Sequence, residues 1–183
     1  VVLTLREVSD VVQRIADGLG QYTGAAERLN QLALSIQLLT QSFRIESEHS
    51  LKHLLTGWTD RLRNYTGNLE AVGGVLEDLL EDCPYLELAY LVDLAGSMIS
   101  FAANPELVGD REHPGGAAVG QNYADRPWFQ ALSRDGRAAV TPIYESLLTD
   151  DPCFTIAIAV RDADGEMVGI LGVDVNLLNW TKI

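Results

Sequence analysis

The chain has 183 residues, 47% of them hydrophobic and 21% charged, so it can form a domain with a core and is neither disordered nor collagen-like. Thirteen basic against 26 acidic residues give a formal net charge of −13, which disfavours nucleic acid as a partner. No apolar run approaches the ~20 residues that span a bilayer, so we expect a soluble chain whose anchor, if it has one, lies outside these residues.

An apolar heptad repeat runs from Val8 to Phe43. Such a repeat, kept this long without proline, predicts a coiled-coil helix over residues 1–46 that pairs with a second copy in a homodimer. An amphipathic helix packed on its own domain is the alternative. The two seam rows are Val8, Ile15, Tyr22, Leu29, Ile36 and Phe43, with Val11, Gly18, Ala25, Leu32 and Leu39.

A second heptad, shifted in phase, contains Leu51, Trp58, Tyr65, Val72 and Leu79. It predicts one long helix over 47–82, with a break from the first helix near 46–50. Cys83-Pro84 ends this helix, because proline disfavours helical backbone in the residue before it.

After Pro84 the apolar pattern changes to that of strands. We expect strands at 85–92, 97–103, 138–145, 153–161 and 167–176, with tight turns at 93–96 and 162–165. Between them lie a long loop at 104–122 and a short helix at 125–133 with Asp125 as its N-cap. The order predicts an α+β fold: long N-terminal helices on one face of a five-stranded antiparallel sheet, with the loop and short helix on the other.

Three motifs carry a resemblance to a known family. They are NYADRPWF at 122–129, TPIY at 141–144 and DGEMVGILGVD at 164–174. Together they resemble the Cache family, the PAS-like ligand-sensing domains of methyl-accepting chemotaxis proteins and other bacterial sensors. The resemblance implies a single Cache domain over 47–183, with a long helix at 47–82 and a PAS-like core at 83–183.

The polar residues of these motifs suit a small zwitterion. Arg126 offers a planar fork for a carboxylate, and Asp174 lies in an otherwise apolar strand, where it could receive an ammonium group. Trp128 offers an indole donor and a cation-attracting face, and Tyr123 and Tyr144 add hydroxyl groups.

Each residue also has an ordinary structural interpretation. Arg126 could form a surface ion pair with Asp125 or Asp135, Trp128 could be a core residue, and Asp174 could accept backbone donors near a turn.

Within the family, the amino-acid receptors are the nearest resemblance, matched at Arg126, Trp128, Tyr144 and Asp174. Phe129 replaces a tyrosine of that pattern, and Tyr123 lies closer to the arginine than the pattern places it. The resemblance therefore implies either an amino acid or a small carboxylate such as pyruvate, lactate or acetate as ligand. The predicted ligand-binding residues are Tyr123, Arg126, Trp128, Phe129, Tyr144 and Asp174.

Residues 8–45 bear a looser resemblance to the closing helix of a chemoreceptor signalling hairpin. It implies a cytoplasmic C-terminal sensor that acts, through its parent receptor, on a chemotaxis histidine kinase and coupling protein. An extracytoplasmic sensor of a membrane receptor is the alternative, as is the sensor domain of a histidine kinase or cyclic-dinucleotide enzyme.

No nucleophile or phosphate-binding motif is present, so we expect no enzymatic activity and no cofactor. His49 and His53 are spaced for one helix face but have no evident third ligand, so we expect no metal. Cys83 and Cys153 are too few for a disulfide framework. A ligand-free structural dimerisation module is the rival hypothesis.

Overall fold

The computed structural model describes residues 8–15, 20, 33, 51–63, 68–109, 118–136 and 138–180. The chain divides into two units, residues 1–50 and residues 51–183, and each is described by itself. Within the described ranges, no helix is both long and apolar enough to cross a membrane.

Of the first unit, residues 8–15 are α-helical and all are exposed. Val8, Val11, Val12 and Ile15 are 49–59% exposed and are spaced as one helical stripe. Most of the predicted heptad, and the predicted break at 46–50, lie outside the described residues.

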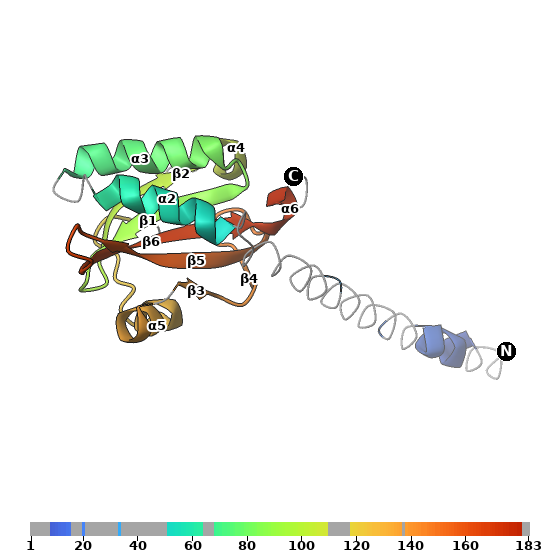
Figure 1. The fold of residues 1–183 in the computed structure, drawn as a ribbon. Coiled ribbons are helices and arrows are strands. Elements are labelled where there is room, and N and C mark those ends of the chain that lie inside the picture. The colour runs from blue at the N-terminus through green and yellow to red at the C-terminus, as the bar shows by residue number, and fades with distance from the viewer. Residues whose placement is uncertain are drawn as a thin grey trace. The chain divides into compact units, whose positions relative to one another are not determined.

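The second unit is built on an antiparallel sheet in the order β2-β1-β6-β5-β3, with β4 paired to β5 (Figure 1). The long central strands β1, β5 and β6 are almost wholly buried because elements cover both faces. The strands are β1 Leu86–Val92, β2 Met98–Ala103, β3 Ala139–Val140, β4 Tyr144–Glu145, β5 Pro152–Arg161 and β6 Met167–Asn176.

The expected strand at 138–145 is wrong in detail, because it forms two short strands and the sheet therefore has six. Thr141, Pro142 and Ile143 separate β3 from β4. Pro142 has no amide hydrogen to give to a ladder, which is the reason for the interruption. The other four expected strands and both tight turns are confirmed within one residue.

The expected single helix over 47–82 is also wrong. Two helices, α2 (Leu51–Arg63) and α3 (Leu69–Asp82), occupy this stretch and cover one face of the sheet (Figure 1). Asn68 starts α3, where its side chain accepts a hydrogen bond from the Ala71 amide. The helix ends at Cys83, as expected.

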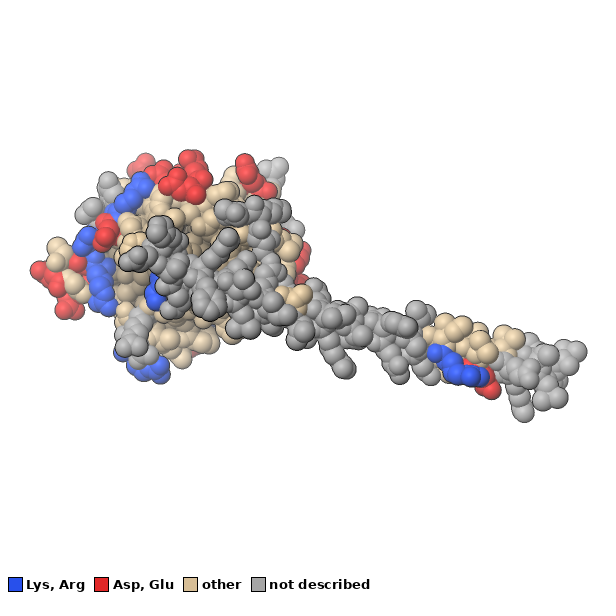
Figure 2. Space-filling model, turned by 45° about the vertical axis from the view of Figure 1, so that its right-hand side comes forward, with Lys and Arg blue, Asp and Glu red and all other residues tan. Residues whose placement is uncertain are grey.

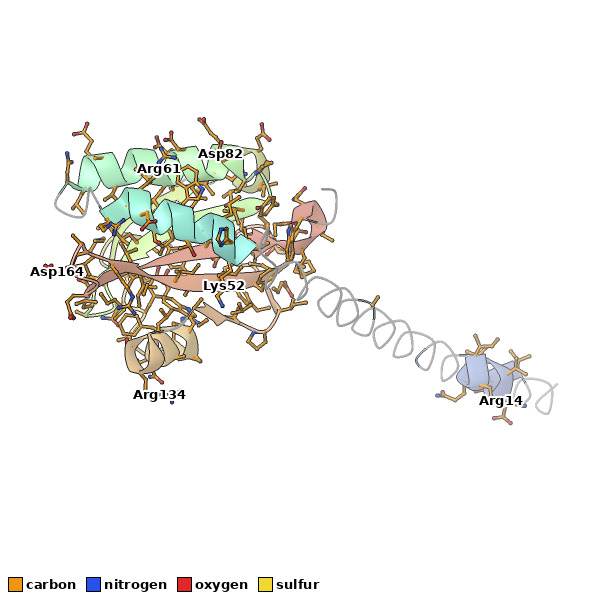
Figure 3. The ribbon with its side chains drawn as sticks, in the orientation of Figure 1. Arg14, Lys52, Arg61, Asp82, Arg134 and Asp164 are labelled. Atoms are coloured by element: carbon orange, nitrogen blue, oxygen red, sulfur yellow. The ribbon has the colours of Figure 1, made fainter. Side chains whose placement is uncertain are left out.

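The described seam residues of that heptad are nevertheless buried, because both helices turn their apolar faces to the same sheet; Tyr65 lies outside the described residues. Leu51, Trp58, Val72 and Leu79 are each at most 6% exposed. Arg61 lies between the two helices (Figure 3) and its Nη2 is 2.6 Å from Asp78 Oδ2. Acidic side chains gather on the outer side of α3 (Figure 2).

The opposite face of the sheet carries α5 (Pro127–Asp135) (Figure 1). Its N-cap is Arg126 rather than the expected Asp125, because Pro127, which needs no amide partner, takes the first helical position. Gly136 ends α5 in the left-handed conformation, with φ of 64°. A further short helix, α4 (Pro105–Val108), lies in the expected loop 104–122, and α6 (Leu177–Trp180) follows β6.

Candidate functional site

A cavity of about 630 Å³ lies between the sheet and α5. Its floor is formed by Leu88 and Tyr90 of β1, Thr155 of β5 and Asp174 of β6. The side walls are the start of α5 and the chain from β3 through β4 to Leu148. A cavity of this size suits a small organic molecule.

A chain of hydroxyl groups surrounds the Asp174 carboxylate on the floor. Thr155 Oγ1 donates to Asp174 Oδ1 over 2.7 Å, and the Tyr144 hydroxyl lies 2.8 Å from Thr155 Oγ1. Burial raises the pKa of Asp174 to about 7; the hydrogen bond from Thr155 lowers it, and the charge of Glu87 raises it. Among the described residues, the Asp174 carboxylate has no cationic partner within ion-pair distance.

Tyr90 supplies a further hydroxyl to this floor. It lies opposite Gly172 in the β1–β6 ladder, and its hydroxyl is one of the hydrogen bonds that lower the pKa of Asp174. A Cβ atom at position 172 would be 2.2 Å from Tyr90 Cε2, so only glycine leaves room for this ring. Burial raises the pKa of the Tyr90 hydroxyl, which therefore stays a donor.

Aromatic rings line the side of the cavity next to α5. Tyr123 stacks on Tyr90 with ring centroids 5.5 Å apart, and Trp128 lies 5.7 Å from Tyr123. The Arg126 guanidinium lies 6.0 Å from the Tyr123 ring centroid. The cavity therefore has the Arg126 cation at its side and the Asp174 carboxylate on its floor, with aromatic surface between them, and Glu145 of β4 adds a second carboxylate to the lining.

Five of the six predicted ligand-binding residues line this cavity: Tyr123, Arg126, Trp128, Tyr144 and Asp174. Phe129 does not. It is 7% exposed and packs edge-on against Trp128 in the core beneath α5. Because Phe129 lies outside the lining, the tyrosine that it replaces in the family pattern leaves no missing hydroxyl in this cavity.

Among the described residues, no ion pair joins Arg126 to Asp125, so the surface ion pair considered for Arg126 is not formed with that residue. The second arginine of this region, Arg134, points away from the sheet on the outer side of α5 (Figure 3). Arg126 is thus the arginine that the start of α5 places at the cavity.

Sequence reasoning missed Tyr90, Thr155 and Glu87. Tyr90 and Thr155 lie inside apolar strands, and only the register of β1 and β5 against Asp174 brings them to the floor. One signal was available: Gly172 lies two residues before Asp174 in a strand, and an interior strand glycine indicates a close approach by another group.

The described residues contain no group of three His, Cys, Asp or Glu side chains that could hold a metal. His49 lies outside the described residues. Cys83 and Cys153 are both free and buried. Burial raises the pKa of both thiols, so they remain protonated and unreactive at neutral pH.

No protein-family model matches the chain. A curated relative, citrate (Re)-synthase of Syntrophus aciditrophicus (strain SB), is 32% identical over 108 residues. The match covers 59% of this chain and 17% of that protein, so the likeness concerns one segment of a much longer chain.

Among solved structures, the ligand-binding domain of the Pseudomonas fluorescens chemoreceptor CtaA, in complex with L-serine, matches 85% of this chain at 23% identity and a TM-score of 0.49. The ligand-binding domain of the Campylobacter jejuni chemoreceptor Tlp3, in complex with 4-methylisoleucine, matches 79% at 19% identity and a TM-score of 0.50. The chain spans 61% and 58% of these two domains. By the match to the Tlp3 domain, the chain shares its fold with part of a chemoreceptor ligand-binding domain.

Proposed function

We propose that residues 51–183 are the sensory ligand-binding domain of a chemoreceptor and bind a small amino acid. The Arg126 guanidinium would hold the ligand carboxylate, Asp174 the ammonium group, and Tyr123 and Trp128 the apolar part. The amino-acid complexes of the CtaA and Tlp3 domains support this ligand class.

One observation carries the proposal. Asp174 is a carboxylate on a cavity floor with hydroxyl donors and, among the described residues, no cationic partner. Such a group costs folding free energy unless a cation joins it. A ligand ammonium at this position would complete the site, and Arg126 at the side would accept the carboxylate of the same molecule.

We further propose that the ligand changes the packing of the cavity walls and that a dimeric helical coil carries this change to a chemotaxis histidine kinase and its coupling protein. Couplings of ~1–3 kcal/mol between sites are sufficient for a several-fold response. In this proposal the domain is not an enzyme, needs no cofactor, and serves as the cytoplasmic C-terminal sensor of its receptor.

Isothermal titration with the twenty L-amino acids, acetate, pyruvate and lactate tests the ligand class. We expect micromolar binding of at least one amino acid, and its loss in Arg126→Ala. Arg134→Ala removes an arginine from the same helix without touching the cavity and is the matched control. Absence of binding by every compound in the panel would contradict the proposal.

The pH dependence of binding separates an amino acid from a simple carboxylate. An ammonium group needs ionised Asp174, so amino-acid affinity should fall as pH is lowered below about 7, up to tenfold per unit. A ligand that uses only Arg126 should lack this loss, and a flat profile would assign the site to a small carboxylate.

A further inference from the structure

Glu87 is a buried carboxylate at an irregular point of the sheet. It is 1% exposed. In the β1–β6 ladder, Leu86 pairs with Val175 and Leu88 with Asp174, so Glu87 is an extra residue of a β-bulge. Bulges redirect side chains, and this one lies directly before Leu88, which forms part of the cavity floor.

Three donors hold the Glu87 carboxylate. Oε1 accepts from the Ser146 hydroxyl; Oε2 accepts from Thr149 Oγ1 over 2.9 Å and from Asn176 Nδ2 over 3.3 Å. The described residues place no cation within ion-pair distance of it. Both oxygens of Glu87 act as acceptors, which a glutamine would not match, because its side-chain amide offers one acceptor oxygen and a donating NH₂ group.

The same donors organise the chain that closes the cavity, residues 146–149, here called the wall. Ser146 Oγ accepts from the Leu148 amide over 3.0 Å, and Thr149 Oγ1 accepts from the Asp151 amide over 3.3 Å. Ser146 and Leu148 also line the cavity. Glu87 therefore holds residues that fix the shape of the wall.

Asn176 extends this network to the C-terminal helix α6. Its Nδ2 donates to Glu87, while its Oδ1 accepts from the Asn179 amide over 3.1 Å in α6. Asn176 also follows Asp174 by two residues in β6. Asn176 Nδ2 also donates to Asp151 Oδ2 over 3.0 Å. Through Asn176, Glu87 thus joins the wall, the sheet beside the cavity floor and the start of α6.

The charge of Glu87 also acts on the floor. Glu87 directly precedes Leu88, which pairs with Asp174 in the β1–β6 ladder, and its charge raises the pKa of the Asp174 carboxyl because two nearby carboxylates repel each other. A cation that enters the cavity relieves this repulsion, whereas an anion or a neutral molecule gains nothing from it. Asp174 and Glu87 thus both add to the negative potential of the floor; Asp174 lines the cavity and Glu87 does not, while Glu145 is a second carboxylate in the lining.

We propose that Glu87 is a positioning residue of the ligand cavity: it ties the wall to the sheet and to α6, and its charge adds to that of Asp174 to favour a cationic group on the floor. The second role rests on the proposed function, since it concerns the ammonium end of the ligand.

The test uses the full chain without ligand and compares Glu87→Gln with Glu106→Gln. The control removes the same charge from an exposed residue of α4 that does not line the cavity. By NMR, we expect Glu87→Gln to speed hydrogen exchange of the Leu148, Thr149 and Asp151 amides on the order of tenfold. We also expect the pKa of Asp174, followed through the NMR signal of its carboxyl carbon, to be lower in Glu87→Gln than in the wild type. A merely structural role of Glu87 would not change this pKa.

Unchanged exchange and an unchanged Asp174 titration in Glu87→Gln would overturn the proposal. If that variant does not fold, Thr149→Val removes one donor and keeps the charge. Thr149→Val should speed hydrogen exchange of the wall amides while the pKa of Asp174 stays raised. Wall amides that exchange as slowly as in the wild type would exclude the role of Glu87 in holding the wall. Neither the hydrogen-exchange measurement nor the pKa measurement needs a ligand. The test of Glu87 therefore remains valid even if no compound in the titration panel binds.

Discussion

At the scale of single residues, Asp174 combines a binding role with a cost to the fold. Its pKa is raised from 3.8 to about 7, so the folded state prefers the protonated form, whereas the unfolded chain ionises near its ordinary value. The contribution of Asp174 to folding stability is therefore fully present below its pKa in the unfolded chain and is lost as pH rises through its pKa in the folded protein. Above pH 7 the ligand-free protein carries the full penalty.

Asp174→Asn should therefore stabilise the ligand-free protein while abolishing amino-acid binding. The gain in unfolding free energy over wild type should be small at pH 4, grow toward pH 7 and then level off at about 2 to 4 kcal/mol. Urea denaturation at pH 4 to 8 measures it. Asp164→Asn in the exposed β5–β6 turn is the control, because it removes a carboxylate that does not line the cavity. A destabilised Asp174→Asn at pH 8 would argue for a structural role of the carboxylate.

The residues that sequence analysis identified differ from those it missed in whether the evidence for them is local in the sequence. Arg126, Trp128 and Asp174 stand out because a charged or aromatic residue interrupts a local pattern. Glu87 and Thr155 are polar residues within apolar strands as well, but their meaning depends on partners 59 and 19 positions away. Pairing register, rather than local pattern, decides their role.

At the scale of elements, the pairing of β1 with β6 shapes the cavity floor through Gly172. Gly172→Ala would place a Cβ atom 2.2 Å from the buried Tyr90 ring, which Tyr123 confines on its other side. We expect a loss of about 1 to 3 kcal/mol of unfolding free energy and weaker ligand binding, because Tyr90 must move away from Asp174. Thermal unfolding and titration measure the two effects.

Gly74→Ala is the matched control for this substitution. Gly74 is an exposed glycine within α3, and a Cβ atom there meets nothing within 4 Å. Alanine in a helix interior should stabilise by about 0.5 to 1 kcal/mol. Changes in unfolding free energy of opposite sign for the two variants would assign the loss in Gly172→Ala to its contact with Tyr90. Equal changes would show that Gly172 has no special role in the cavity floor.

The two misjudged elements have different causes. An apolar heptad fits one helix on a sheet and equally two successive helices that both face it, so periodicity identified the buried residues of α2 and α3 but not the break at Asn68. The interruption between β3 and β4 was signalled by Pro142, whose missing donor weighs more than the apolar residues on either side.

At the scale of the whole molecule, the two units predict a separation of tasks. Residues 51–183 contain the sheet, both covering layers and the cavity. In the first unit, the exposed residues Val8, Val11, Val12 and Ile15 form an apolar stripe suited to a partner helix. Binding should thus belong to the second unit and dimerisation to the first.

A fragment of residues 51–183 should unfold cooperatively, bind the same amino acid with the affinity of the full chain, and sediment as a monomer. The full chain should sediment as a dimer, and Val11→Asp with Ile15→Asp should weaken that dimer without changing ligand affinity, because a buried carboxylate in a helical seam lacks a partner. Sedimentation equilibrium and isothermal titration measure the two properties on the same samples. If the fragment is a dimer, the dimer interface lies in residues 51–183. If the full chain is a monomer, the proposed signalling through a dimeric coil is wrong, whereas the proposed ligand site is unaffected.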